Sequence, residues 1–149
     1  MATTSKTKAG RAQRVWRLMF DVLMSTAPQR TEVLGRLGLT PNDSRALASL
    51  DPKMGRSMRS LANEWRCDAS NATWIVDRLE RAGLAERRGL PADRRVKLVV
   101  LTPKGMKTKA DLMEAFYNTP PQLLDLDNAE LDGLEQLLKK LTTQRGTNG

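Results

Sequence analysis

Histidine is absent from this chain of 149 residues, and cysteine occurs once, at Cys67. Without imidazole the chain cannot build a Ser-His-Asp or Cys-His catalytic set, or a histidine-based zinc, haem or iron site. A single cysteine also excludes an internal disulfide and a paired-cysteine metal clip. These absences remove much familiar enzyme chemistry, and we expect no metal site and no cofactor.

Aromatic residues are scarce at 4% of the chain, so that Leu, Val, Met and Ala must fill any core. No run approaches the roughly 20 consecutive apolar residues that cross a bilayer. The polar first residues are not followed by the apolar stretch of a signal peptide. We therefore expect a cytoplasmic protein that does not contact membranes. The length of the chain predicts one domain, or one domain plus arms.

Positive charge is in excess, because 25 Lys+Arg residues stand against 17 Asp+Glu and give a net charge of +8. Such a charge suits nucleic acid, an anionic membrane surface or acidic proteins, and does not choose among them. The excess lies in residues 1–24 and 51–101, whereas residues 102–149 are slightly acidic. Within residues 87–97 a single acid, Asp93, accompanies five basic side chains: Arg87, Arg88, Arg94, Arg95 and Lys97.

Apolar residues at helical spacing predict an N-terminal helical region over residues 11–37, after a flexible basic arm at residues 1–10. Within this region we expect a second, shorter helical segment at about residues 31–37. A Thr-Pro pair at residues 40–41 predicts the start of a further helix. The first apolar stripe consists of Val15, Leu18, Met19, Val22 and Leu23.

A pair of helices joined by a short turn is predicted at residues 57–82. The first ends near Trp65, Asp68 is a good N-cap for the second, and Gly83 suits the left-handed position that ends it. This pattern is typical of a helix-turn-helix, although an ordinary helical hairpin shares it. The second helix is amphipathic, and its apolar stripe consists of Ala72, Ile75, Val76, Leu79 and Ala82.

Two strand candidates follow this pair, at residues 84–88 and 96–101, with turn-forming residues and a basic tip between them. A helix-turn-helix followed by a basic β-hairpin is a winged helix. Its second helix can enter the major groove of DNA, and its wing can reach the neighbouring minor groove. We thus expect a mainly α fold with a small two- or three-stranded β-wing, in which residues 38–102 form a winged helix-turn-helix DNA-binding region.

Further helices are predicted over residues 103–142, before a disordered tail at residues 143–149. Thr102 and Pro103 repeat the cap-plus-proline start, and Asp127 and Glu130 have the spacing of a capping box. A leucine stripe follows at Leu131, Leu134, Leu138 and Leu141. Such stripes are buried either within one subunit or against a second one, and we favour dimerisation for a chain this small.

Two stretches resemble the MarR family of bacterial transcription regulators. Residues 67–84, CDASNATWIVDRLERAGL, are similar to the family's recognition helix, and residues 93–102, DRRVKLVVLT, match its wing pattern D-x-R-x-x-x-V-x-L-T. The resemblance implies an obligate homodimer whose first and last helices interlock, with two winged-helix lobes on a pseudo-palindromic operator and no catalytic activity. The residues expected at the dimer interface are Val15, Leu18, Val22, Leu131, Leu134, Leu138 and Leu141.

Helical geometry turns several side chains of the recognition helix away from its apolar stripe. Capping and solvation explain any single one of them as well as DNA contact does. Trp74 departs from the smaller polar or basic residue of many family members, and its indole either meets a thymine methyl group or packs against the neighbouring helix. The residues that we assign to DNA contact on this helix are Ser70, Asn71, Thr73, Trp74 and Arg78.

The wing is expected to contact DNA through Arg87, Arg88, Arg94, Arg95 and Lys97. Guanidinium groups suit a narrow, electronegative minor groove, and Arg95 is the arginine of the matching wing motif. Phosphates would repel Asp93, so we expect it to pair with a nearby arginine and stabilise the wing.

The resemblance also implies an effector, because family members often bind small aromatic or phenolic ligands between the dimer helices and the DNA lobe. Some relatives sense oxidants through a cysteine in the N-terminal helix. Cys67 lies instead in the turn before the recognition helix, so we expect a small buried hydrophobic residue there. Core packing explains the candidate pocket residues equally well; they are Trp16, Met19, Met54 and Trp65.

These patterns together predict a sequence-specific, dimeric, ligand-responsive regulator of transcription that binds DNA, with repression as the expected direction. A non-specific nucleic-acid-binding protein and a winged-helix protein-interaction adaptor remain as alternatives. The first would bind random and native DNA equally, and the second would not bind DNA.

Overall fold

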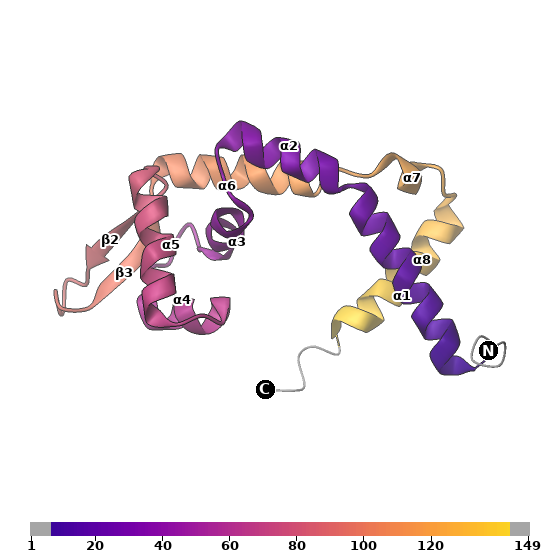
Figure 1. Cartoon of the computed structure of the whole chain (residues 1–149), viewed down its shortest axis with the longest axis horizontal. Helices are drawn as coiled ribbons and strands as arrows, with labels where there is room; N and C mark the ends of the chain where they lie inside the picture. The colour runs from indigo at the N-terminus through magenta and orange to yellow at the C-terminus, as the bar shows by residue number, and fades with distance from the viewer. Residues whose placement is uncertain (1–6, 144–149) are drawn as a thin grey trace. The chain divides into compact units, whose positions relative to one another are not determined.

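The computed structural model describes residues 7–143 of the chain. The contacts within the chain divide the whole sequence into two units, Met1–Tyr117 and Asn118–Gly149. The mainly helical fold with a small sheet is confirmed (Figure 1). Within the described residues, no helix combines the length and apolarity needed to cross a bilayer. The first unit contains α1 (Lys8–Ser25), α2 (Ala27–Leu37), α3 (Pro41–Ser49), β1 (Arg56–Ser57), α4 (Met58–Trp65), α5 (Ala69–Arg81), β2 (Ala85–Gly89), β3 (Lys97–Leu101) and α6 (Pro103–Phe116), and the second contains α7 (Pro121–Leu124) and α8 (Asn128–Thr143).

The first two helices start earlier than the apolar pattern predicts. α1 begins at Lys8 rather than near Arg11, because the Thr7 hydroxyl accepts a hydrogen bond from the Gly10 N–H at 3.1 Å and caps the helix. α2 begins at Ala27 with a proline in its first turn, where the missing N–H costs nothing. The rest of the predicted arm, residues 1–6, and residues 144–149 of the predicted tail lie outside the described part.

The helix-turn-helix is present as predicted. Ser57 caps α4, and the Asp68 carboxylate accepts the Asn71 N–H at 2.7 Å and caps α5. Gly83 has the expected left-handed conformation, with φ of 71°. α3 packs against α5, and its Thr40–Asp43 capping box fixes where it begins.

A three-stranded antiparallel sheet forms the wing, in the order β1-β3-β2. Arg87 of β2 and Arg56 of β1 both lie opposite Val99 of the central strand. Only β2 and β3 are predicted as strands, because the two residues of β1 are too short to show an alternating pattern. Val99 is fully buried, which anchors the base of the wing in the core.

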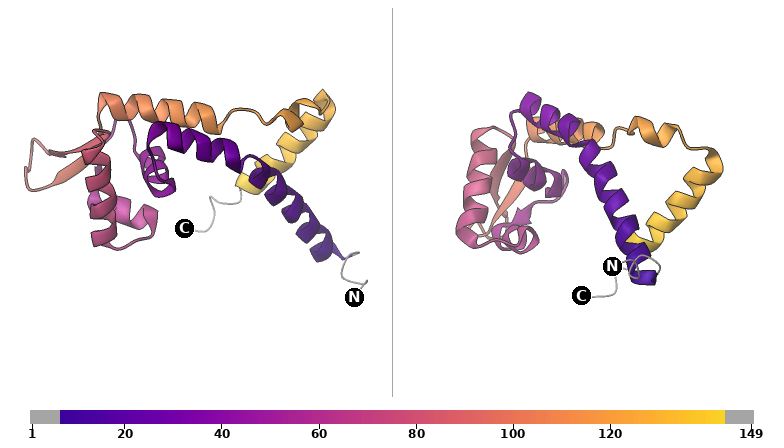
Figure 2. Two further views of the ribbon diagram at one scale, coloured as in Figure 1. Left: turned by 45° about the horizontal axis from the view of Figure 1, so that its top comes forward. Right: turned by 45° about the vertical axis from the view of Figure 1, so that its right-hand side comes forward.

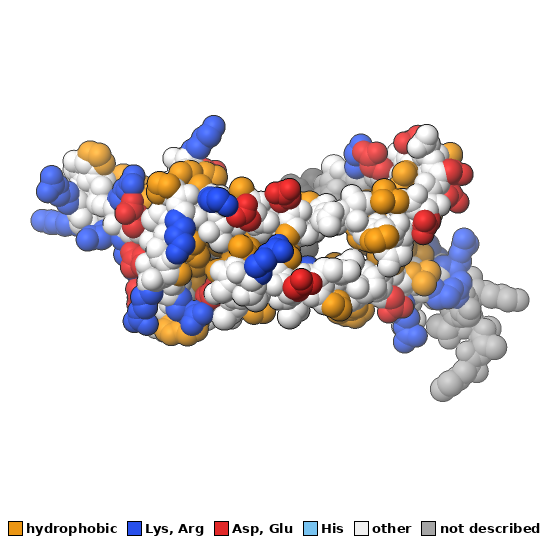
Figure 3. Space-filling view, turned by 90° about the horizontal axis from the view of Figure 1, so that it is seen from above, with side chains coloured by type: hydrophobic (Ala, Val, Ile, Leu, Met, Phe, Trp, Pro, Cys, Tyr) orange, Lys and Arg blue, Asp and Glu red, His pale blue; other side chains and the backbone are white. Residues whose placement is uncertain are grey.

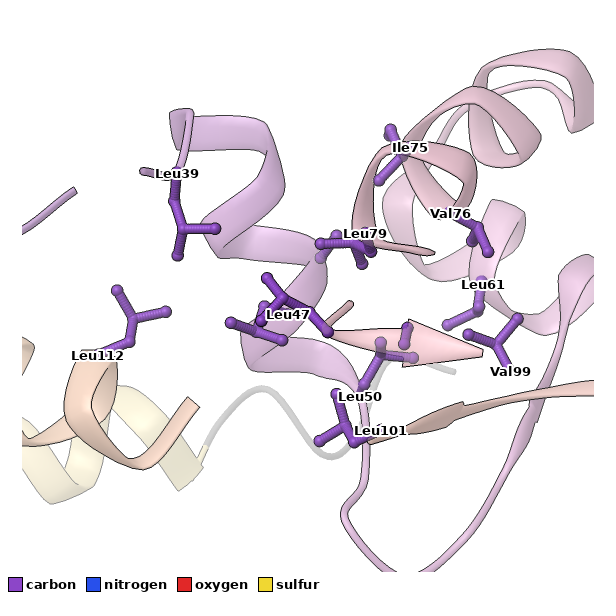
Figure 4. Packing of buried hydrophobic residues seen from close by; sticks show 13 residues of the cluster. Leu39, Leu47, Leu50, Leu61, Ile75, Val76, Leu79, Val99, Leu101 and Leu112 are labelled. Carbon is purple, nitrogen blue, oxygen red and sulfur yellow. The ribbon is translucent and has the colours of Figure 1, made fainter. Parts of the chain in front are cut away.

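The core lies between α3, α4, α5 and the sheet, where leucine and valine side chains converge (Figure 4). The predicted α5 stripe is buried except for Ala82, which is exposed because it is the C-cap of the helix rather than part of its last turn. The largest fully buried side chains are Leu47, Leu50, Leu61, Leu79, Leu112, Val76 and Val99.

α6 joins the winged helix to the rest of the chain. It packs along α2, as both views in Figure 2 show. Its N-cap Thr102 also donates its hydroxyl to the Gly83 carbonyl at 2.6 Å, just after α5. A Cβ on Gly105 would lie 1.8 Å from the Leu84 carbonyl oxygen, so only glycine permits this approach.

The second unit holds one element that the sequence does not predict, the single turn of α7. The expected capping box before α8 is confirmed, since the Asp127 and Glu130 side chains each accept the other residue's backbone N–H, at 2.9 and 3.0 Å. α8 then runs to Thr143, a residue that the sequence assigns to the tail.

Candidate nucleic-acid interface

The outer face of α5 carries the side chains predicted for DNA contact. Ile75, Val76 and Leu79 hold the opposite face in the core, because these positions are three and four residues apart. This packing leaves the outer face of the N-terminal half of the helix open to solvent. Four of the predicted contact residues are exposed there together: Ser70, Asn71, Thr73 and Trp74.

Two of these side chains are engaged locally. The Ser70 hydroxyl donates to the Asp68 carboxylate at 2.8 Å, and the Thr73 hydroxyl donates to the Ala69 carbonyl at 2.8 Å. Hydrogen bonds from the Asn71 N–H and from Ser70 lower the pKa of Asp68, so this cap stays ionised. Among the described residues, no hydrogen bond involves the Asn71 side-chain amide, which leaves both its donor and its acceptor available for a base edge.

Arg78 is held by Asp43 of α3. Its Nε and Nη2 donate to the two oxygens of Asp43 at 3.0 and 2.8 Å. The Asp43 side chain is only 5% exposed, and the bonds from Arg78, partly offset by burial, lower its pKa from 3.8 to about 2. The guanidinium also lies 5.0 Å from the ring centroid of Trp74. Arg78 therefore already has an acidic partner within the chain, and its DNA contact stays a prediction.

The wing tip, residues 90–96, carries two exposed arginines, Arg94 and Arg95. Within the described part of the chain, no ion pair involves Arg94, Arg95 or Lys97. Figure 3 shows blue side chains gathered at the left end, where Figure 1 places the wing. The predicted stabilising role of Asp93 takes another form, because its carboxylate accepts the backbone N–H of Arg95 at 3.0 Å instead of pairing with an arginine side chain.

The other two predicted wing contacts lie away from the tip and are paired. Arg87 bridges the wing to the recognition helix, since its guanidinium contacts Glu80 and lies 2.8 Å from the Asp77 carboxylate. Arg87 therefore has two acidic partners on α5, and its phosphate contact stays a prediction. Arg88 is exposed and donates from Nε to Glu86 at 2.6 Å, a pair that solvent weakens.

Two arginines that the sequence patterns missed flank the start of α5. Arg45 of α3 and Arg66 of the turn help to line a hollow of about 220 Å³ that also includes Asn71. Arg66 has φ of 52°, an unusual left-handed conformation for a residue other than glycine. Isolated basic residues carry no motif, so only the fold brings them beside the recognition helix.

The four residues of the predicted effector pocket are not brought together. Trp65 lines the hollow beside α5 and donates its indole N–H to the Ser49 hydroxyl at 2.8 Å, whereas Trp16 lines a separate hollow on α1. Met54 is exposed in the loop before β1, and Met19 is half-buried on α1. Cys67 is also half-buried rather than buried, because the helix-turn-helix turn opens onto the same hollow as Trp65.

The residues predicted for dimerisation lie on helices with open apolar surfaces. On α1, Leu18 is 65% exposed, and Val15 and Val22 are about half exposed. On α8, Leu138 and Leu141 are exposed, while Leu131 and Leu134 are half-buried. Such stripes on both helices are unusually apolar for a surface that faces only water.

An N-capped helix-turn-helix beside a basic three-stranded wing defines a winged helix-turn-helix protein. Comparison with known proteins agrees, since residues 37–96 match the MarR family. The transcriptional repressor MprA of Escherichia coli (strain K12) is 30% identical over 133 residues, which cover 86% of this chain and 74% of that protein.

Solved structures show the same fold over nearly the whole chain. A MarR family protein from Bacillus stearothermophilus superposes with a TM-score of 0.78 at 23% identity, over 93% of this chain and 98% of that one. A mutant of S. aureus MepR, bound to an oligodeoxyribonucleotide, gives 0.67 at 20% identity, over 87% and 96% of the two chains. The chain belongs to the MarR family, and is therefore a DNA-binding transcriptional regulator rather than an enzyme.

Proposed function

We propose that the chain is a homodimeric repressor that binds a pseudo-palindromic operator. One observation carries the proposal: Arg94 and Arg95 of the wing tip, which form no ion pair among the described residues, lie on the same winged helix as the outward face of α5. The helix would enter the major groove, where the Asn71 amide can bond an adenine edge. The wing arginines would enter the neighbouring minor groove.

Contacts to the DNA backbone would come from the periphery of this surface. Lys97, Arg45 and Arg66 are exposed and suited to phosphates, which fix register without reading sequence. Ser70 and Thr73 keep acceptor lone pairs, but their hydrogens are used within the helix. The MepR structure, which contains DNA, supports this use of the fold.

Dimerisation would cover the apolar stripes of α1 and α8. Two copies would place their recognition helices about one DNA turn apart, ~34 Å, and the operator would then be an inverted repeat. A small aromatic or phenolic effector that favours a different spacing would release the DNA. Such a regulator acts where the DNA is, which in the bacteria that carry its relatives is the cytoplasm.

Selection from random duplexes tests the proposal. Duplexes retained by the full chain at physiological salt are sequenced, and we expect an inverted repeat with half-site centres about 10 base pairs apart. Retention without any enriched sequence would instead identify a non-specific nucleic-acid-binding protein. No retention even at low salt would favour a protein-interaction adaptor.

A further inference from the structure

Asp43, Arg78 and Trp74 form a chain of contacts from the core to the outer face of α5. Asp43 belongs to α3, and its side chain is buried. One of its oxygens accepts both the Thr40 N–H at 3.1 Å and Arg78 Nη2 at 2.8 Å, while the other accepts Arg78 Nε at 3.0 Å. Three hydrogen bonds therefore fix the carboxylate, and the carboxylate fixes the plane of the guanidinium.

The guanidinium in turn limits the positions open to the indole of Trp74. The two residues are four apart on one helix, so their side chains are neighbours, and the distance from Arg78 Cζ to the ring centroid is 5.0 Å. The Trp74 residue remains 53% exposed. The indole is thus held on one side by a cation and open to solvent on the other.

We propose that Trp74 reads the 5-methyl group of a thymine in the major groove, and that Asp43 and Arg78 are positioning residues that hold its indole for this contact. The inference rests on the proposed DNA-binding function. Apart from its single N–H donor, the indole of Trp74 is apolar and gains little from phosphates or from polar base edges. The thymine methyl group is the apolar feature that the major groove presents.

The pairing with Asp43 makes Arg78 suited to a positioning role. Its Nε–H and one N–H of Nη2 are used by the Asp43 carboxylate. Releasing them would leave a buried carboxylate without its partner, which is costly. The guanidinium therefore stays beside Asp43, where it also contacts the indole of Trp74.

Replacing thymine by deoxyuridine tests this proposal, because it removes only the methyl group. In a duplex selected by the wild-type chain, each thymine is replaced singly, and the dissociation constant is measured by fluorescence anisotropy with a labelled duplex. We expect one thymine per half-site at which the replacement weakens binding about fourfold, the effect of losing one buried methyl group.

Variants distinguish the residue that contacts the methyl group from the residues that hold it in place. Trp74→Ala should bind the thymine and deoxyuridine duplexes equally, and Trp74→Phe should retain most of the difference. Asp43→Asn and Arg78→Lys should reduce the ratio of the dissociation constants for the deoxyuridine and thymine duplexes to less than twofold. A loss of folded protein would weaken binding to both duplexes equally and leave this ratio unchanged. Arg81→Lys, on an exposed arginine of the same helix, is the matched control and should keep the wild-type ratio.

Two results would overturn the inference. Wild-type indifference to every single replacement would show that no thymine methyl group is read, and an unchanged ratio in Trp74→Ala would assign the methyl contact to another residue. In either case a tightly bound selected duplex would leave the DNA-binding function standing. If no duplex is bound, the proposed function and this inference fail together.

Discussion

The Asp43 carboxylate is the buried charge that ties α3 to the recognition helix, and it gives the fold a dependence on acid. Its pKa falls from 3.8 to about 2 because it accepts hydrogen bonds from Arg78 and Thr40. The unfolded chain binds the proton first as pH falls, so the stabilisation is complete above pH 4 and is lost towards pH 2. The shift corresponds to about 2 kcal/mol of the free energy of unfolding.

Asp43→Asn should remove this dependence. Between pH 5 and pH 2, its free energy of unfolding, measured with urea, should fall by about 2 kcal/mol less than that of the wild type. Asp111→Asn makes the same chemical change at an exposed position on α6 and should follow the wild type. Equal pH profiles for Asp43→Asn and the wild type would show that the Arg78 pair does not stabilise the fold.

Arg95→Ala should weaken operator binding by about 1 to 3 kcal/mol, the range expected for the loss of an arginine that contacts bases. The dissociation constant for a selected duplex provides the measurement. Arg36→Ala removes the same charge from an exposed position on α2 and serves as the control. Equal affinities for the two variants, both with intact folds, would remove Arg95 from the interface.

The sequence predicts which side chains are exposed better than it predicts which side chains form ion pairs with one another. The outward face of α5 and the basic wing tip follow from helical spacing and turn composition, and the structure has both. The bond between Arg78 and Asp43 joins residues 35 apart in sequence, and no periodic pattern links them. The same holds for Arg87, whose acidic partners become neighbours only after the wing folds back on α5.

At the scale of elements, the junction between α6 and β2 depends on Gly105. Gly105→Ala would place its Cβ 1.8 Å from the Leu84 carbonyl oxygen. Backbone cannot move aside as a side chain does, so we expect a loss of about 2 to 3 kcal/mol in the free energy of unfolding by urea.

Gly35→Ala is the matched control for this substitution, because a Cβ there would meet nothing within 4 Å. The alanine should stabilise α2 by about 0.5 to 1 kcal/mol, since glycine is the weaker helix former. A gain of stability in both alanine variants would show that Gly105 does not lie this close to the Leu84 carbonyl oxygen.

Capped elements were predicted well, and short ones were not. Thr40, Asp68, Thr102 and Asp127 mark helix starts that the structure confirms, because a cap satisfies backbone groups locally. β1 exists only because β3 offers a partner, and α7 is one turn long. Neither β1 nor α7 is long enough to show an alternating or helical pattern of apolar residues in the sequence.

At the scale of the whole molecule, Leu18→Asp should weaken dimerisation. A charge is tolerated where Leu18 faces water, but is costly when buried against a second copy. The dimer dissociation constant, measured by sedimentation velocity, should rise about thirtyfold or more, equivalent to 2 kcal/mol. Met54→Asp places a charge at an equally exposed position outside α1 and α8, and should leave the dimer intact.

A monomeric wild type would contradict the proposed dimer. If the wild type is dimeric and Leu18→Asp unfolds more readily without a change in mass, α1 packs within its own chain instead. The apolar stripes were visible in the sequence, but a stripe does not say whether its partner is the same chain or a copy. The winged-helix fold, in contrast, followed from the order of its elements.

Sequence-specific binding is tested most directly by the affinity for a selected duplex relative to a scrambled duplex of the same length and composition, at physiological salt. Direct readout by two recognition helices and two wings predicts a ratio of about 10³ or more in favour of the selected duplex. Equal affinity for the two duplexes would mean that the +8 charge, rather than the outer face of α5 and the wing, accounts for DNA binding.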